Sequence, residues 1–255
     1  MFASTDRVEL STLWDELVAG TCKIESWSHE PDAWSLVVTR DPALIGSLAI
    51  PLRQRDREIL ENALLCGVRK IVAVEARLSC SSIAVIMQSC FQFMGLHCLP
   101  SRIPGLVVAA AHARHRQPTG FGASLRATRD RRLMQRSIRV PRPDTALASW
   151  LAPAEHAVIA LLTEGQSYAE IARARNTSVR TVANQVASGF RRLGVSGRAE
   201  LLCLLARWGL DSPELPQRRH PASVPAAARR SLESGLRLLD ESAGAEHCLS
   251  PGLPT

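Results

Sequence analysis

Apolar and polar positions at the start of the chain predict one helix and one hairpin. Apolar side chains recur at helical spacing over 8–19, and Gly20 follows them as a stop signal. The segments 21–28 and 33–40 are rich in residues that favour strands, and the turn-forming sequence at 29–32 lies between them. We therefore expect an amphipathic helix followed by two antiparallel strands.

Two longer blocks, 52–112 and 150–210, show the periodicity of short helices. The segment 114–144 between them is rich in arginine, and residues 136–140 are predicted to form a short strand there. This segment is either a solvated linker or an arm that contacts the DNA backbone. Proline, serine, alanine and arginine dominate 211–255, which we predict to be disordered.

The second helical block has clear start and stop signals. A first helix ends at Gly165, a short helix is expected over 168–175, and residues 176–177 form a tight turn. Ser178 is a favourable N-cap for a third helix that runs to Leu193. Two short helices joined by a tight turn are a unit that places its second helix in the major groove of DNA.

The third helix of this block is amphipathic. Its apolar side carries Val182, Val186, Gly189, Phe190 and Leu193. Its opposite side carries Arg180, Asn184, Ala187, Ser188 and Arg191, with Thr181, Gln185 and Arg192 on the flanks. Arginine donates to guanine N7 and O6, and asparagine or glutamine pairs with adenine, so the polar side suits base recognition.

Several motifs of this block occur in one register. They are Leu151…Glu155…Ile159, Leu162-x-x-Gly165, Glu170-Ile171-Ala172, Ser178-x-x-Thr181-Val182 and Leu193-Gly194-Val195-x-x-Arg198-Ala199-Glu200-Leu201. With them, residues 150–210 resemble the LuxR/FixJ-type helix-turn-helix. The resemblance implies that 178–192 is the recognition helix and that 198–208 is a fourth helix that packs two protomers together. Ala154, Ala183 and Gln185 depart from the arginine, lysine and histidine usual in the family.

These patterns select two sets of candidate residues. The expected DNA contacts are Ser178, Arg180, Thr181, Asn184, Gln185, Ser188, Arg191 and Arg192. The expected dimer contacts are Leu201, Leu204, Leu205 and Trp208 on the fourth helix. The fourth helix carries more apolar side chains than a three-helix core covers, so we expect a homodimer.

The first helical block repeats the second at an offset of 99 residues. The aligned pairs are Leu52/Leu151, Leu60/Ile159, Ala73/Ala172, Ser79/Ser178, Ser82/Thr181, Ile83/Val182, Phe91/Phe190 and Gly95/Gly194. We interpret 52–107 as a degenerate LuxR-like unit. The segments 36–44 and 137–147 are weakly similar too, so the expected fold is mainly α, with two helix-turn-helix units and strand segments before each.

Charge separates the two units. The helix expected over 80–94 holds no basic residue, and its outward positions include Val85, Met87 and Phe93. Phosphate neutralisation provides most non-specific affinity for DNA, and an uncharged helix contributes none of it. We expect this helix either to contact protein or to lie in the core.

Composition restricts the partners and the compartment. The chain of 255 residues has a net charge of +7, and all of its basic residues except Lys23 and Lys70 are arginine, which favours nucleic acid. The seven cysteines form no C-x-x-C pair, so we expect a reducing, cytoplasmic compartment. The uncharged run 78–101 is long enough to span a bilayer, but it contains serines, glutamines, a histidine and a proline, so no membrane span is predicted. No catalytic residue, cofactor or metal site is expected.

The sequence therefore indicates a sequence-specific DNA-binding transcriptional regulator, and not an enzyme. The alternative is an adaptor whose helix-turn-helix binds a sigma factor or another regulator; a third interpretation is a sigma-factor-like promoter contact. The expected partners are double-stranded DNA, a second copy of the chain and, as a further candidate, RNA polymerase. The predicted domains are an N-terminal domain (1–112), a linker (113–149), the DNA-binding domain (150–210) and a tail (211–255).

Overall fold

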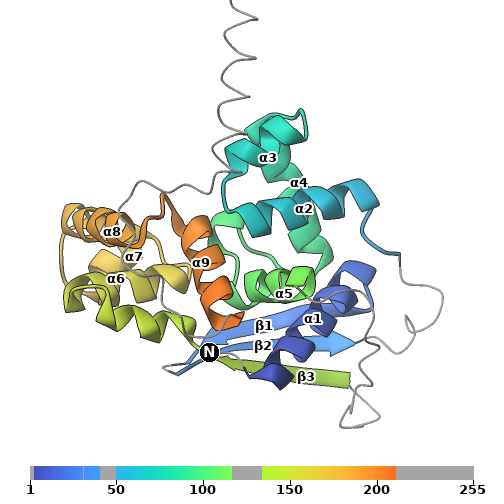
Figure 1. Ribbon diagram of the computed structural model, residues 1–255, viewed down its shortest axis with the longest axis horizontal. Coiled ribbons are helices and arrows are strands. Elements are labelled where there is room, and N and C mark those ends of the chain that lie inside the picture. Colours follow the sequence, from blue (N-terminus) through green and yellow to red (C-terminus); the bar gives the residue numbers. More distant parts are fainter. Residues whose placement is uncertain (1–2, 31, 41–49, 117–133, 211–255) are drawn as a thin grey trace, which may run out of the picture. The chain divides into compact units, whose positions relative to one another are not determined.

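The computed structural model describes residues 3–30, 32–40, 50–116 and 134–210. This part of the chain is mainly helical, with one three-stranded antiparallel sheet (Figure 1). The predicted first helix, the hairpin, the later strand and both blocks of short helices are confirmed. The tail at 211–255 and the middle of the arginine-rich segment lie outside the described residues, so the predictions made for them stay predictions.

The described residues form the following helices and strands, given in chain order. They are α1 (Ser4–Ala19), β1 (Cys22–His29), β2 (Ala33–Arg40), α2 (Gln54–Cys66), α3 (Arg69–Glu75), α4 (Cys80–Phe93), the 3-10 helix η2 (Pro100–Arg102), α5 (Gly105–Arg116), β3 (Met134–Pro141), the 3-10 helix η3 (Pro143–Ser149), α6 (Pro153–Thr163), α7 (Tyr168–Ala174), α8 (Val179–Leu193) and α9 (Arg198–Leu210).

The sheet joins segments that are far apart in the sequence. Its strand order is β1-β2-β3, and both neighbouring pairs are antiparallel, with Leu36 opposite Ile138. Leu36 and Ile138 are buried, whereas Ser26, Ser28 and Ser137 on the other face are exposed. Strand alternation thus gives the sheet one apolar face, and α1 and α5 pack against it (Figure 1).

Helix α5 lies at the centre of the described fold. Every residue from Gly105 to Ala113 is buried, because α1, α2, α9 and β2 all contact this helix. A helix that is apolar on all sides is stable only when other elements cover it completely. The elements on both sides of the predicted linker therefore share one core, although the division into an N-terminal domain, a linker and a DNA-binding domain remains a prediction.

The arginines of the segment around β3 bind acidic residues of the same chain. Arg136 contacts Glu16 at 3.2 Å, and Arg139 contacts Asp32 at 2.9 Å. Both acidic partners come from the N-terminal part of the chain. These two arginines therefore connect β3 to earlier elements of the chain.

The uncharged run at 78–101 forms α4 and its flanks. No single helix among the described residues is long and apolar enough to cross a membrane; by length and composition alone, α3 and α4 pass that test only as a pair bent by 102°. Ile83, Met87, Cys90 and Phe91 of α4 are buried in the protein core. The expectation that Met87 points outward is therefore wrong, whereas Val85 is 68% exposed as expected.

Glycine is required at the end of α2, where the chain turns beside α9. Gly67 has a φ of +73°, and a Cβ atom there would lie 2.9 Å from Glu200 Cα and 3.0 Å from Cys203 Sγ. Gly194, which ends α8, has a similar φ of +68° but no atom within 4 Å of such a Cβ. The two positions share the backbone strain of an added side chain and differ only in their surroundings.

We expect Gly67→Ala to destabilise the protein more than Gly194→Ala does. Left-handed backbone costs alanine about 1–2 kcal/mol at either position. At Gly67 the contact with α9 adds about 1–3 kcal/mol of overpacking. Urea denaturation of the two variants measures the difference in unfolding free energy, and equal losses would contradict the close approach of α9.

Candidate nucleic-acid interface

Helices α6, α7 and α8 form the tight unit that the sequence predicts. Asn176 adopts a φ of +50° in the turn between α7 and α8, which allows the two helices to follow each other closely. Ser178 caps α8, and its hydroxyl accepts a hydrogen bond of 3.0 Å from the amide of Thr181. Val182 and Val186, on the inner side of α8, are buried. Local capping and an apolar stripe therefore fix the helix with its other side outward.

The outward side of α8 carries three polar residues that the sequence selects. Arg180, Asn184 and Arg191 are all exposed, and they fall on one side of the helix. None of the three takes part in an ion pair within the described part of the chain. These side chains are positioned to donate hydrogen bonds to a partner outside the protein.

The other five selected residues have partners or sit partly inside. The hydroxyls of Ser178 and Thr181 lie 2.8 Å apart and bond to each other. Gln185 is half-buried, and its Oε1 atom finds no hydrogen-bond partner among the described residues. Ser188 hydrogen-bonds to Glu155, and Arg192 Nε lies 3.3 Å from the carboxylate of Glu155.

Glu155 ties the start of α6 to the end of α8. Its carboxylate accepts a hydrogen bond of 3.0 Å from the amide of Ala152. The hydrogen bond from Ser188, followed by that from the Ala152 amide and the charge of Arg192, lowers the pKa of Glu155. An ionised Glu155 therefore keeps Arg192 beside α6, and Arg192 is less available to a partner than Arg180 or Arg191.

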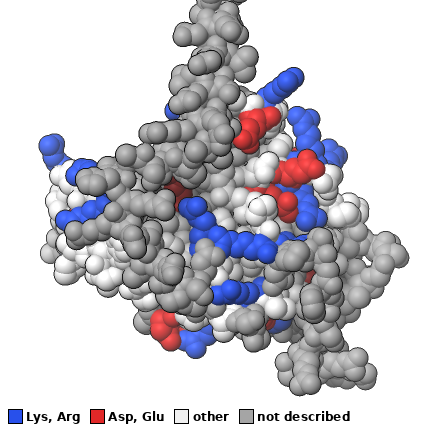
Figure 2. Space-filling view, viewed as in Figure 1, with Lys and Arg blue, Asp and Glu red and all other residues white. Residues whose placement is uncertain are grey.

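The charge of this face is positive. Helix α8 contains three arginines and no acidic residue. In Figure 2, the part of the surface where Figure 1 places α8 shows basic side chains separated by uncharged atoms. Such a surface attracts phosphate.

Tyr168 and Val179, which were not selected from the sequence, are also exposed, at the first residues of α7 and α8. Each of them is the first residue of a helix, and this position is the signal in the sequence that could have identified them.

The residues expected at a dimer contact are largely covered within one chain. Leu201 and Leu205 are fully buried, because α9 packs against α5. Leu204 is half-buried, and Trp208 packs against Trp150 with ring centroids 6.2 Å apart. The apolar excess on the fourth helix was correctly identified. Helix α5 covers Leu201 and Leu205 within the same chain, and the homodimer stays a prediction.

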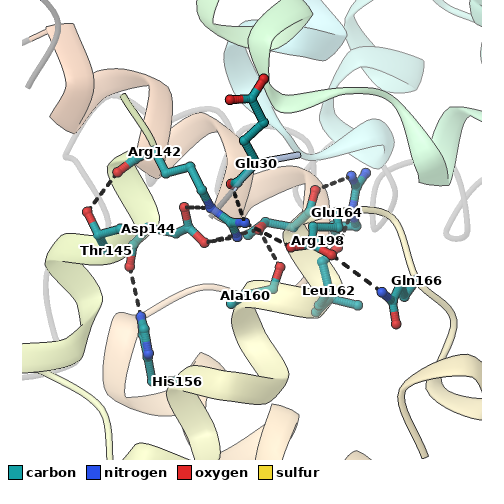
Figure 3. Close-up of polar contacts among 11 residues, drawn as sticks. Glu30, Arg142, Asp144, Thr145, His156, Ala160, Leu162, Glu164, Gln166 and Arg198 are labelled. Atoms are coloured by element: carbon teal, nitrogen blue, oxygen red, sulfur yellow. Dashed lines mark hydrogen bonds and ion pairs between the residues drawn. The ribbon is translucent and has the colours of Figure 1, made fainter. Parts of the chain in front are cut away.

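Arg142 and Arg198 anchor helices α6 to α8 to the rest of the protein (Figure 3). Neither role was predicted from the sequence. Arg142 is buried with Asp144, whose Oδ2 atom lies 2.6 Å from Arg142 Nη2, and Arg142 Nη1 also contacts Glu164 at 2.9 Å. Burial alone would lower the pKa of Arg142, but Asp144 and then Glu164 raise it above its ordinary value. This arginine stays charged and holds η3 to the end of α6.

Arg198, at the start of α9, bonds to backbone carbonyls only. Its guanidinium donates to Leu162 O at 2.7 Å and Thr163 O at 2.8 Å, two carbonyls at the C-terminus of α6. It also donates to Ser101 O at 2.8 Å, within η2, and to Ile103 O at 2.9 Å, directly after η2; both residues belong to the first helical block. Burial lowers the pKa of Arg198 to about 10. One side chain thus adds donors to carbonyls at the C-terminus of α6 and joins the two blocks.

Comparison with known proteins agrees with this geometry. The model of the family described as bacterial regulatory proteins, luxR family, matches residues 149–205, which include α6, α7, α8 and most of α9. No curated protein and no solved structure matches the chain. The C-terminal part of the described chain is therefore a LuxR-family helix-turn-helix domain.

Proposed function

We propose that the chain is a sequence-specific DNA-binding transcriptional regulator that inserts α8 into the major groove. The open face of α8, with Arg180, Asn184 and Arg191 exposed on a capped helix after a tight turn, is the observation that carries this proposal. Arginine and asparagine are the side chains that distinguish guanine and adenine in that groove. The family match at 149–205 supports the same class of function.

Each residue of the face has a proposed role. Arg180 and Asn184, in the N-terminal half of α8, contact base edges, and Arg191 contacts bases or the adjacent phosphate. Ser178 and Thr181 hold the start of the helix and present their hydroxyls to phosphate. Gln185 and Ser188, which are half-buried, and Arg192, which is paired with Glu155, contribute less to the contact with DNA.

Arg180→Ala and Arg191→Ala are expected to weaken binding to a selected duplex by about 1–3 kcal/mol each if the arginine contacts a base. A contact to phosphate alone would weaken binding to all sequences alike and reduce the salt slope by about one. Titration of labelled duplexes at several salt concentrations measures both quantities. Arg55→Ala removes an equal charge from an exposed position on α2 and is the matched control.

Unchanged binding by both α8 variants would contradict the groove assignment. A chain with no salt-dependent affinity for duplex DNA would favour the adaptor that binds a sigma factor or another regulator. Contact with RNA polymerase stays a prediction of the sequence. So does a homodimer, although the surface of α9 that suggested it is covered by α5.

A degenerate helix-turn-helix in the first block is part of the same proposal. Helices α2, α3 and α4 have lengths of 13, 7 and 14 residues, close to the 11, 7 and 15 residues of α6, α7 and α8. Ser79 caps α4 as Ser178 caps α8. These similarities support the internal repeat that the sequence predicts.

A further inference from the structure

The two helical blocks repeat each other in backbone conformation as well as in sequence. We call α2 to α5 the first unit and α6 to α9 the second unit. Left-handed residues end or connect their helices at matching places: Gly67 and Gly165, Arg77 and Asn176, Gly95 and Gly194. Arg77 and Asn176 have φ values of 53° and 50° and lie 99 residues apart, although their side chains differ. Strained backbone at matched positions is independent of side-chain similarity and indicates the same fold in both units.

The two units contact each other reciprocally. The turn at Gly67 in the first unit lies against α9, and a Cβ atom there would be 2.9 Å from Glu200 Cα. The turn at Gly165 in the second unit lies against the segment before α5, and a Cβ atom there would be 3.4 Å from Arg102 O. Each unit thus places the same turn beside the start of the other unit's fourth helix. Reciprocal contact of this kind is the mark of an isologous interface, which two copies form around a two-fold axis.

Other contacts between the units follow the same arrangement. The fourth helices, α5 and α9, pack on each other between the two sets of shorter helices (Figure 1). Strand β2, which precedes the first unit, pairs antiparallel with β3, which precedes the second. Arg102 of the first unit contacts Glu170 of the second at 3.1 Å, and the Cys203 thiol of the second donates to Leu64 O of the first. Sheet, helix and side-chain contacts therefore all join the same two halves.

Only one of the two outward helix faces carries the chemistry that recognises DNA. At the offset of 99 residues, Ser81, Val85 and Gln92 of α4 take the places of Arg180, Asn184 and Arg191 of α8. Helix α4 has no basic residue, and Val85 is 68% exposed where Asn184 stands in α8. The first unit keeps the fold and the interface of its counterpart and lacks its charged face.

We propose that the first unit replaces a second protomer: it covers α9 as an internal partner, and the chain recognises a single half-site of DNA as a monomer. Helix-turn-helix dimers bind two half-sites about 10 bp apart because each protomer contributes one recognition helix. In this chain the paired units contribute one such helix between them. This inference rests on the proposed function and specifies the form of DNA that the chain recognises.

Selection of binding sequences from a pool of random duplexes by the full-length chain tests this proposal. We expect one uninterrupted block of conserved bases without an inverted repeat, and one chain per duplex by sedimentation. Adding a second, inverted copy of the block is expected to raise the affinity by no more than about twofold, whereas linked binding of two heads raises it about a hundredfold or more. Gln92→Ala, at the place that corresponds to Arg191, is expected to leave affinity unchanged.

Two results would overturn the proposal. One is an inverted repeat occupied by two chains; the other is a second conserved block about 10 bp away that Gln92→Ala or Val85→Ala weakens. The mass of the chain without DNA tests the internal pairing separately: a monomer supports it, and a stable dimer contradicts it. If no sequence is enriched while the free chain is a monomer, the proposed function fails and the internal pairing stands.

Discussion

Replacement of Arg198 by methionine is expected to lower the free energy of unfolding by about 3 kcal/mol or more. The guanidinium donates to four carbonyls, two at the end of α6 and two around η2. Methionine fills a similar length of side chain but donates no hydrogen bond, so all four carbonyls lose a charged donor. Leu162 O keeps the amide of Gly165 and Ser101 O is exposed, so the largest losses fall on Thr163 O and Ile103 O. A buried acceptor without a partner costs about 1–3 kcal/mol, and the separate costs do not simply add.

Urea denaturation at neutral pH measures the loss, and Arg207→Met is the matched control. Arg207 lies on the same helix, is exposed, and bonds only to Cys203 O of its own helix, at 3.3 Å, among the described contacts. Arg198→Lys is expected to recover part of the stability, because one ammonium group cannot reach all four carbonyls. Equal stability of Arg198→Met and Arg207→Met would contradict the role of Arg198 in joining the two units.

The local structure of the DNA-binding domain followed from its sequence because its signals are short-range. Ser178 caps α8, Asn176 takes the left-handed turn, and Gly165 follows α6, each within a few residues of the helix that it begins or ends. The side of α8 that faces outward followed from the periodicity of Val182 and Val186. Propensity, capping and amphipathicity decide these features, and all three are visible in a window of one or two helical turns.

The contacts that join the units could not be predicted in the same way. The sequence shows that α9 is apolar on more than one side, and does not show which element covers it. Leu201 and Leu205 are covered by α5, which lies about ninety residues earlier in the chain. Arg136 and Arg139 likewise find Glu16 and Asp32 more than a hundred residues away. The sequence around a residue does not identify a partner that lies far away in the chain, so these contacts could not be predicted.

The internal pairing explains why the first unit retains a helix-turn-helix form without a basic face. Its conformation is needed to present α5 and the turn at Gly67 to α9, and that requirement does not extend to the outward side of α4. Val85 and Ser81 on that side carry no positive charge that could neutralise phosphate. A fragment that ends at residue 112 would lose β3 and α9, so the two units are best compared in the full-length chain.

The free energy of unfolding is expected to fall by about 3 kcal/mol as the pH is lowered from about 6.5 to about 4, through the titration of His112. His112 is buried in α5, where burial and then the charge of Arg207 lower its pKa to about 4. The unfolded chain binds a proton at this histidine near pH 6.5, and the folded chain does not. Stability is therefore fully present above pH 6.5 and is lost as the pH falls, by up to about 1.4 kcal/mol for each pH unit.

Urea denaturation of the parent and of His112→Leu between pH 7 and pH 5 isolates this effect, since most carboxylates titrate below that window. Burial also lowers the pKa of His29, which adds a dependence of the same sign to both proteins, so the difference between them belongs to His112. Because His112 lies beside the backbone of Leu64 and near Arg207, its protonation places a second positive charge between α5, α2 and α9. Parallel stability curves for His112→Leu and the parent would show that this histidine is accessible to water, and that the two units are less tightly packed than their contacts require.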